Sequence, residues 1–175
     1  MRIFGITGYS GSGKTTLIER MLPQMIERGL RVSVLKHAHH DFDVDRPGKD
    51  SFRHRQAGAS EVLLVNASRW VLMRELRGAP EPTLAECASR FSPCDLLLVE
   101  GFKREPIARL EVHRPAHGKP PLWPEQRQIV AVASDEAEPA GLPAGLRWLD
   151  LNDVPAIVAF ILDHLQRTEE ADAVV

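Results

Sequence analysis

The sequence predicts an α/β domain, in which a mostly parallel β-sheet is flanked by helices and interrupted by one β-hairpin excursion. Three observations support this fold class. Short apolar runs of strand length alternate with segments of helical periodicity, a strand–loop–helix unit opens the chain, and one pair of apolar runs is separated by only two residues. Alternating strands and helices are typical of parallel sheets. We expect residues 1–166 to form a single domain and the polar residues 167–175 to fray.

The composition is that of an ordinary soluble domain, with 175 residues of which 43% are hydrophobic and 26% charged. The formal net charge of −2 argues against nucleic acid or an anionic membrane as a partner. No apolar run approaches the ~20 residues of a membrane span, and the N-terminus enters a strand without a signal peptide. Cys87 and Cys94 lack metal-ligand spacing and are expected to be reduced thiols. The composition therefore predicts a cytoplasmic protein.

The elements follow in order from the N-terminus. Residues 2–7 predict a buried strand, and the helix after residue 14 has an apolar stripe and a stop at Gly29. Pro23 is expected to kink or divide that helix, because its ring clashes with the carbonyl group of Glu19. The remaining expected elements are a strand at 31–36, a helix at 49–57, hairpin arms at 61–66 and 69–76, a helix at 83–91, strands at 95–101, 108–112, 129–133 and 146–149, and a helix capped by Asp153.

The loop between the first strand and the first helix, Gly8–Thr15, matches the phosphate-binding pattern G-x-x-x-x-G-K-[ST]. Its glycines let backbone N–H groups point at phosphate oxygens, and the helix N-terminus favours the same anion. The Lys14 side chain would reach the β- and γ-phosphates, and the Thr15 hydroxyl would bind Mg²⁺. The residues assigned to the phosphates are Gly8, Ser10, Gly11, Ser12, Gly13, Lys14, Thr15 and Thr16. The loop predicts a P-loop NTPase-like fold and a bound nucleotide.

Glu100 ends the most apolar strand of the chain, and Gly101 follows it. Ligands of open parallel sheets lie at the carboxyl ends of the strands, so Glu100 is expected at the nucleotide and Asp95 at the opposite edge. We assign Glu100 as a catalytic residue that holds Mg²⁺ or its waters, and the Gly101 N–H group to the γ-phosphate. The alternative is that the two residues only terminate a strand.

Three histidines and three aspartates follow the second strand, between residues 37 and 45. Three interpretations are open: a solvated polar loop, a switch-like loop in which Asp41 or Asp43 touches Mg²⁺ or its waters, and a transition-metal site. We favour the switch-like loop, with Asp41 as a catalytic candidate and Asp41 and Asp43 as metal ligands.

Asp135 follows the strand at 129–133 and is the candidate reader of the base. A carboxylate there would accept hydrogen bonds from guanine N1–H and its exocyclic amine, a donor pair that adenine lacks. The common N-K-x-D guanine motif is absent from the chain. Asp135 therefore predicts GTP as the nucleotide.

The second hairpin arm is apolar on both faces, with Trp70 and Leu72 on one and Val71 and Met73 on the other. Such a segment is either an interface between copies of the chain or buried in the sheet of its own monomer. Periodicity alone does not separate these two possibilities.

Four motifs together resemble the MobB family, whose full name is molybdopterin-guanine dinucleotide biosynthesis protein B. The motifs are Gly8–Thr15, Lys36-His37-x-His39-His40-Asp41-x-Asp43-x-Asp45, Gly48-Lys49-Asp50-Ser51 with Arg55-x-Ala57-Gly58-Ala59, and Val99-Glu100-Gly101-Phe102-Lys103. The resemblance implies a dimeric GTP-binding adaptor with at most slow GTP hydrolysis. It also implies a partner, the MobA-type guanylyltransferase that joins GMP to molybdopterin, with molybdopterin itself as a further candidate ligand. The resemblance favours a homodimer formed through the hairpin.

Two alternatives come from other functional classes. A small-molecule kinase would use Asp41 as the base, although no arginine-rich lid stands out in the sequence. A GTP-driven metal-insertion chaperone would use His37, His39 and His40. Phosphate transfer to an acceptor would favour the kinase, and stoichiometric nickel or zinc binding would favour the chaperone.

Overall fold

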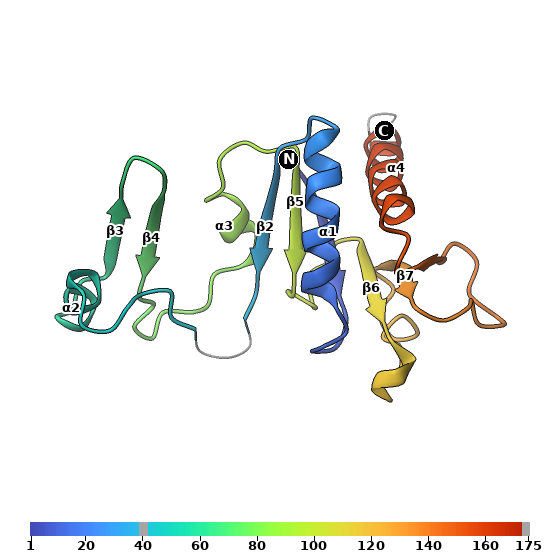
Figure 1. The fold of residues 1–175 in the computed structure, drawn as a ribbon, viewed down its shortest axis with the longest axis horizontal. Helices are drawn as coiled ribbons and strands as arrows, with labels where there is room; N and C mark the ends of the chain where they lie inside the picture. The colour runs from blue at the N-terminus through green and yellow to red at the C-terminus, as the bar shows by residue number, and fades with distance from the viewer. Residues whose placement is uncertain (39–41, 173–175) are drawn as a thin grey trace. The chain divides into compact units, whose positions relative to one another are not determined.

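The computed structural model describes residues 1–38 and 42–172, which form two compact units. The first unit comprises Met1–His37 and Leu84–Val175, and the second comprises Ala38–Thr83. The first unit carries the glycine-rich loop and the second the hairpin (Figure 1).

The first unit is built on a six-stranded sheet in which every neighbouring pair of strands is parallel. Its strands lie in the order β2-β5-β1-β6-β7-β8. The bounds are β1 Arg2–Thr7, β2 Val32–Lys36, β5 Leu96–Glu100, β6 Arg109–His113, β7 Ile129–Ser134 and β8 Arg147–Asp150. The predicted parallel sheet is confirmed, and the carboxyl ends of all six strands share one edge.

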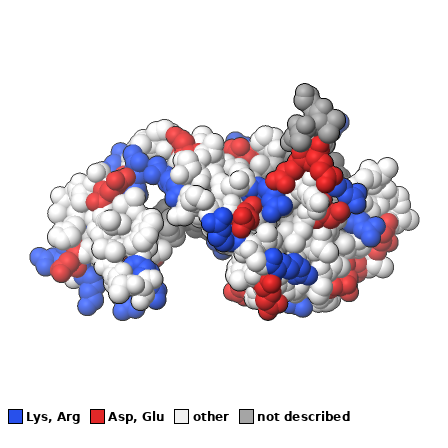
Figure 2. Space-filling view, turned by 90° about the horizontal axis from the view of Figure 1, so that it is seen from above, with Lys and Arg blue, Asp and Glu red and all other residues white. Residues whose placement is uncertain are grey.

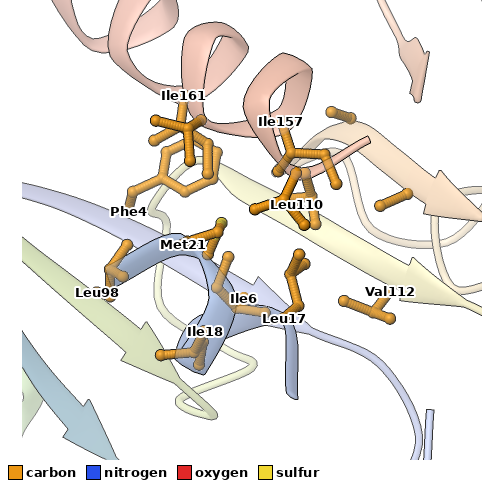
Figure 3. Packing of buried hydrophobic residues seen from close by; sticks show 14 of the residues in the cluster. Phe4, Ile6, Leu17, Ile18, Met21, Leu98, Leu110, Val112, Ile157 and Ile161 are labelled. Carbon is orange, nitrogen blue, oxygen red and sulfur yellow. The ribbon is translucent and has the colours of Figure 1, made fainter. Parts of the chain in front are cut away.

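Two long helices, α1 (Lys14–Glu27) and α4 (Val154–Asp172), lie side by side over one face of this sheet (Figure 1). Their apolar stripes and the inward side chains of the strands form the main core, in which Phe4, Met21 and Ile161 are completely buried (Figure 3). The short helix α3 (Leu84–Ala88) contributes to a second cluster with alternate residues of β5. Layers of helix on both faces explain why β5 is apolar along its length.

The structure changes several expected boundaries. Helix α1 is not divided at Pro23, because a continuous buried stripe on both sides of the proline packs against the sheet. Helix α4 continues to Asp172, so residues 167–172, expected in a frayed tail, are helical. Its N-terminus is capped as expected, since the N–H of Ala156 donates to Asp153 Oδ1 at 3.0 Å. The proline-rich loop contains a short 3₁₀ helix, η1 (Pro115–His117).

The second unit contains helix α2 (Asp50–Gln56) and the antiparallel strands β3 (Glu61–Val65) and β4 (Trp70–Arg74). The predicted hairpin is confirmed. Asn66 shapes its turn, because its side-chain oxygen accepts bonds from the N–H groups of Ser68 and Arg69 at 2.8 and 2.9 Å. These strands form a two-stranded sheet of their own, so β4 is not a strand of the main sheet.

Within residues 1–38 and 42–172, no helix is both long and apolar enough to cross a membrane.

Candidate nucleotide site

The loop of residues 8–15, called the glycine loop below, joins the carboxyl end of β1 to the first turn of α1. Gly8 has φ +141°, and a Cβ atom there would lie 2.5 Å from the carbonyl oxygen of Val112 in β6. Only glycine therefore permits this close approach. The Lys14 ammonium group folds back over the loop and donates to the Tyr9 carbonyl oxygen at 2.8 Å. The hydroxyl of Ser12 is buried without a hydrogen-bond partner among the described residues.

Charged side chains gather beside Lys14 at the carboxyl ends of β2 and β5. Burial lowers the pKa of the Lys14 ammonium group, Glu100 opposes this shift, and the nearby Lys103 and Lys36 add to it. The ammonium nitrogen of Lys36 lies 3.6 Å from Glu100 Oε2. The structure thus places Glu100 at the glycine-loop edge of the sheet. Asp95 directly precedes the same strand at the opposite edge, where its carboxylate accepts a bond from the Arg31 N–H.

A fully buried arginine of β6, Arg109, holds the backbone of the loop after Glu100, residues 101–105. The guanidinium group of Arg109 donates to the carbonyl oxygens of Gly101 at 2.8 Å and Glu105 at 2.9 Å, and also to that of Phe102. The arginine crosses Gly5 of β1, where a Cβ atom would lie 2.7 Å from Arg109 Cγ. Burial lowers the pKa of Arg109 and the charge of Glu105 opposes this shift, while the three carbonyl groups accept hydrogen bonds from the guanidinium group.

A second arginine joins the glycine loop to the predicted base reader. Arg114 follows β6, and its Nε atom donates to the Ser12 carbonyl oxygen at 3.1 Å. Its Nη1 atom lies 2.6 Å from Asp135 Oδ2. One guanidinium group therefore connects the carboxylate of Asp135, just after β7, to the glycine loop.

Glu111, also in β6, fixes the proline-rich loop. It is fully buried, and its two carboxylate oxygens accept bonds from the N–H groups of Leu122 at 2.8 Å and Trp123 at 3.0 Å. Burial raises the pKa of Glu111, while these two bonds act in the opposite direction.

Of the predicted metal ligands, Thr15 and Glu100 belong to the first unit and Asp43 to the second. In the second unit, Arg55 binds Asp43 at 2.8 Å together with Asp45 and Glu75 at 3.1 and 2.7 Å. His39, His40 and Asp41 lie outside the described residues. In the part of the chain that is described, no three His, Cys, Asp or Glu side chains are grouped as a metal site would require. The N–H of His37 donates to the Glu100 carbonyl oxygen at 2.8 Å, and its ring packs 4.7 Å from that of Phe102.

Sequence reasoning did not assign roles to Arg109, Glu111 or Arg114. Their partners are backbone atoms of loops distant in sequence, which no local spacing reveals. One feature of the sequence could have indicated them: charged residues alternate with apolar ones in a segment that is also predicted to be a strand.

The model of the family described as "MobB: Molybdopterin guanine dinucleotide synthesis protein B" matches residues 3–135. The chain belongs to the MobB family. A relative from Haemophilus influenzae, named molybdopterin-guanine dinucleotide biosynthesis adapter protein, is 47% identical over 93% of this chain and 89% of its own length. The relative of the same name from Escherichia coli is 41% identical over 94% of both chains.

Solved structures agree with this membership. A crystal structure of molybdopterin-guanine biosynthesis protein B has a TM-score of 0.71 and 32% identity, and covers 93% of this chain and 99% of its own. The crystal structure of MobB from Bacillus subtilis has a TM-score of 0.70 and 27% identity over 94% of this chain and 98% of its own. The P-loop NTPase-like fold predicted from the glycine loop is thus the fold of this family.

Proposed function

We propose that this chain is a GTP-binding adapter in the biosynthesis of molybdopterin guanine dinucleotide. It assists the guanylyltransferase that joins GMP to molybdopterin, and hydrolyses GTP slowly at most. The names of its relatives support the pathway, and its own glycine loop supports the nucleotide. The proposal also places the protein in the cytoplasm and leaves molybdopterin as a second candidate ligand.

One observation carries the nucleotide assignment: the glycine loop, Lys14 and Glu100 lie together at the carboxyl edge of the sheet. The fold of the loop fits a polyphosphate, because its lysine bonds only a loop carbonyl oxygen and its buried Ser12 hydroxyl has no partner among the described residues. Lys14 would hold the β- and γ-phosphates, and Thr15 with Glu100 would hold Mg²⁺ or its waters. Bound Mg²⁺ neutralises phosphate charge.

The test compares the affinity for GTP and ATP by calorimetry, with and without Mg²⁺. GTP should be preferred, and Lys14→Ala should weaken it by about ten- to a hundredfold through the loss of a charge-assisted contact. Arg28→Ala is the matched control, since it removes the same charge at the far end of α1. Unchanged GTP affinity in folded Lys14→Ala protein contradicts the site.

In this proposal, Asp135 is the residue that selects guanine over adenine. Asp135→Asn should weaken GTP and relax discrimination against xanthosine triphosphate, which has a carbonyl where guanine has an amine. Equal affinity of the parent protein for GTP and ATP would overturn this assignment.

Slow turnover is expected because the groups beside the loop supply only charge. Among the described residues, we assign no side chain to orient the attacking water. Hydrolysis should be far below the ~10 s⁻¹ of a typical enzyme. Glu100→Ala should reduce Mg²⁺-dependent binding or turnover, while Asp95→Asn, at the other end of β5, should leave both unchanged. Rapid hydrolysis by the isolated protein would point to an ordinary GTPase.

The hairpin supports a homodimer as part of the proposal. Leu63, Val65, Trp70 and Leu72 share one exposed face, with Val65 73% and Trp70 63% exposed. The space-filling view shows a broad area without charged side chains over this unit (Figure 2). Exposed apolar patches of this kind mark interfaces.

Trp70→Glu should give monomers by light scattering that still bind GTP. Arg69→Glu at the turn should leave the dimer intact. A monomeric parent at high micromolar concentration would end this proposal.

A further inference from the structure

A small cavity lies near Asp135, beyond the carboxyl ends of β6 and β7 and against Trp148 of β8. It has a volume of about 200 Å³, and its walls are mainly apolar rings, with His113 and Glu136 among the polar residues at its edge. Two tryptophans line it, Trp123 from the proline-rich loop and Trp148 from β8, together with Pro115. Neither tryptophan is fully buried. Flat apolar walls with a few polar groups at the rim are typical of sites for planar heterocycles.

Both tryptophans are held in place by hydrogen bonds. The buried Glu111 accepts the N–H of Trp123 at 3.0 Å and so fixes the backbone that presents this side chain. The indole N–H of Trp148 donates to the Glu136 carbonyl oxygen at 3.0 Å, which ties β8 to the segment after β7. The cavity is therefore preorganised, and a ligand would lose little to the ordering of its walls.

Arg114 and the η1 turn connect the edge of the cavity to the glycine loop. Arg114, between the lining residues His113 and Pro115, contacts Ser12 on one side and Asp135 on the other. The η1 turn also lies against the loop, since a Cβ atom added at Gly11 would be 3.2 Å from His117 Cε1. A ligand with phosphates in the glycine loop would have this cavity beside it, on the side of the loop that Arg114 contacts.

We infer that this cavity binds the purine ring of the nucleotide whose phosphates occupy the glycine loop. The inference rests on the proposed function and adds to it a base pocket walled by Trp123 and Trp148. The volume fits this division, because about 200 Å³ is below the ~300–1,000 Å³ of pockets that enclose a whole ligand. The cavity volume suits a single ring system. Asp135 would accept hydrogen bonds from the edge of the ring, and the two tryptophans would contact its faces.

The experiment separates the ring from the phosphates by using GDP and pyrophosphate as two probes. Tryptophan fluorescence is recorded in Trp70→Phe protein, in which the two cavity tryptophans are the only tryptophans, with excitation that does not excite Tyr9. GDP should quench the emission and pyrophosphate should not. Trp123→Ala should weaken GDP about 5- to 100-fold, the range for loss of one base–aromatic stack, and leave pyrophosphate affinity unchanged. Trp148→Phe, which keeps a ring, should weaken GDP less, and the control Trp70→Phe should not affect either probe.

Each other outcome has a distinct meaning. If wild-type protein binds neither probe, the proposed function fails, and the base pocket, which rests on it, is overturned with it. If GDP binds and Trp123→Ala leaves its affinity unchanged, the inference is overturned. It is likewise overturned if Trp123→Ala weakens pyrophosphate as much as GDP, since the tryptophan then only supports the loop. Quenching by a free pterin that does not compete with GDP would assign the cavity to a second molecule and also overturn it.

Discussion

The two strands that flank β1 are both buried, yet their sequences are unlike. Strand β5 is Leu-Leu-Leu-Val-Glu, with four apolar side chains that face the two layers of helix and a single carboxylate at its end. Strand β6 is Arg-Leu-Glu-Val-His, with every residue buried although three of the five are polar or charged. The first strand presents one group to the candidate site. The second strand shapes the loops around it.

The alternation in β6 explains how a strand can bury so much charge. Leu110 and Val112 point into the main core, while Arg109 and Glu111 lie on the opposite face and bond to the backbone of loops 101–105 and 115–124. A buried charge is tolerated where hydrogen bonds replace its hydration. A charged residue in a central strand can therefore be read as an anchor for a loop at the carboxyl edge.

The largest expected effect comes from Arg109→Met, which keeps an unbranched apolar stem and removes the guanidinium group. The carbonyl groups of Gly101, Phe102 and Glu105 would lose their partner, at about 1–3 kcal/mol for each buried group left unsatisfied. We expect a loss of about 3 kcal/mol or more in the free energy of unfolding, measured by urea titration. Amide exchange should accelerate in residues 101–107 and not in residues 122–123.

Arg127→Met is the matched control, since Arg127 is exposed, and its effect should stay within about 0.5 kcal/mol. An Arg109→Met protein as stable as the parent would show that loop 101–105 does not depend on β6.

Gly5→Ala tests the same contact from the neighbouring strand. The added methyl group would lie 2.7 Å from Arg109 Cγ, so either the arginine or β1 must shift. We expect a loss of about 1–3 kcal/mol by overpacking. The free-energy changes of Gly5→Ala and Arg109→Met should be non-additive, because each acts on the same side chain. Additive changes in the double variant would separate the glycine from the arginine.

The comparison of β5 with β6 also shows which parts of the molecule the sequence predicts. The glycine loop and the Glu100 strand end are local patterns, and the structure places both at the same edge as expected. The hairpin turn is likewise local, since Asn66 bonds to residues two and three positions ahead. These features depend on residues close to one another in the chain.

Contacts between distant residues were not predictable from spacing. Arg114 lies 102 residues from Ser12 and 21 from Asp135, so no short motif contains all three. The same is true of the ion pair between Asp43 and Arg55, which are twelve residues apart. Helix α1 continues through Pro23 because tertiary packing of its buried stripe outweighs the local break.

Glu111→Gln should have a smaller effect than Arg109→Met. Glutamine offers one oxygen to the two N–H groups of Leu122 and Trp123, so we expect a loss of about 1 kcal/mol near neutral pH. Burial raises the folded-state pKa of Glu111, so the folded protein binds more protons than the unfolded chain just above pH 4.5. The contribution of Glu111 to stability therefore falls as pH rises through this window.

The measurement is urea unfolding of wild type and Glu111→Gln from pH 4.5 to 7.5. The difference between them should be largest at the acidic end and should shrink as pH rises, with faster amide exchange at Leu122 and Trp123 only. A difference that grows with pH would mean that burial does not dominate the pKa of Glu111.

The smallest effect is expected at the far end of β5, from Asp95→Asn. The Arg31 N–H, which donates to Asp95 Oδ2 at 2.7 Å, lowers the folded-state pKa of this carboxyl group, and the Arg31 side chain adds to the shift. An acid with a lowered pKa stabilises the fold at pH values above its unfolded-state pKa, here about 3.8, and this contribution is lost as pH falls through the folded-state pKa.

Because the pair is largely exposed, Asp95→Asn should change the free energy of unfolding little at pH 7. It should flatten the acid limb of the stability curve below pH 4. Urea unfolding of both proteins between pH 2.5 and 7 measures this, and added salt should reduce the difference. If Asp95→Asn instead lowered GTP affinity as Glu100→Ala is expected to do, the two ends of β5 would not have separate roles.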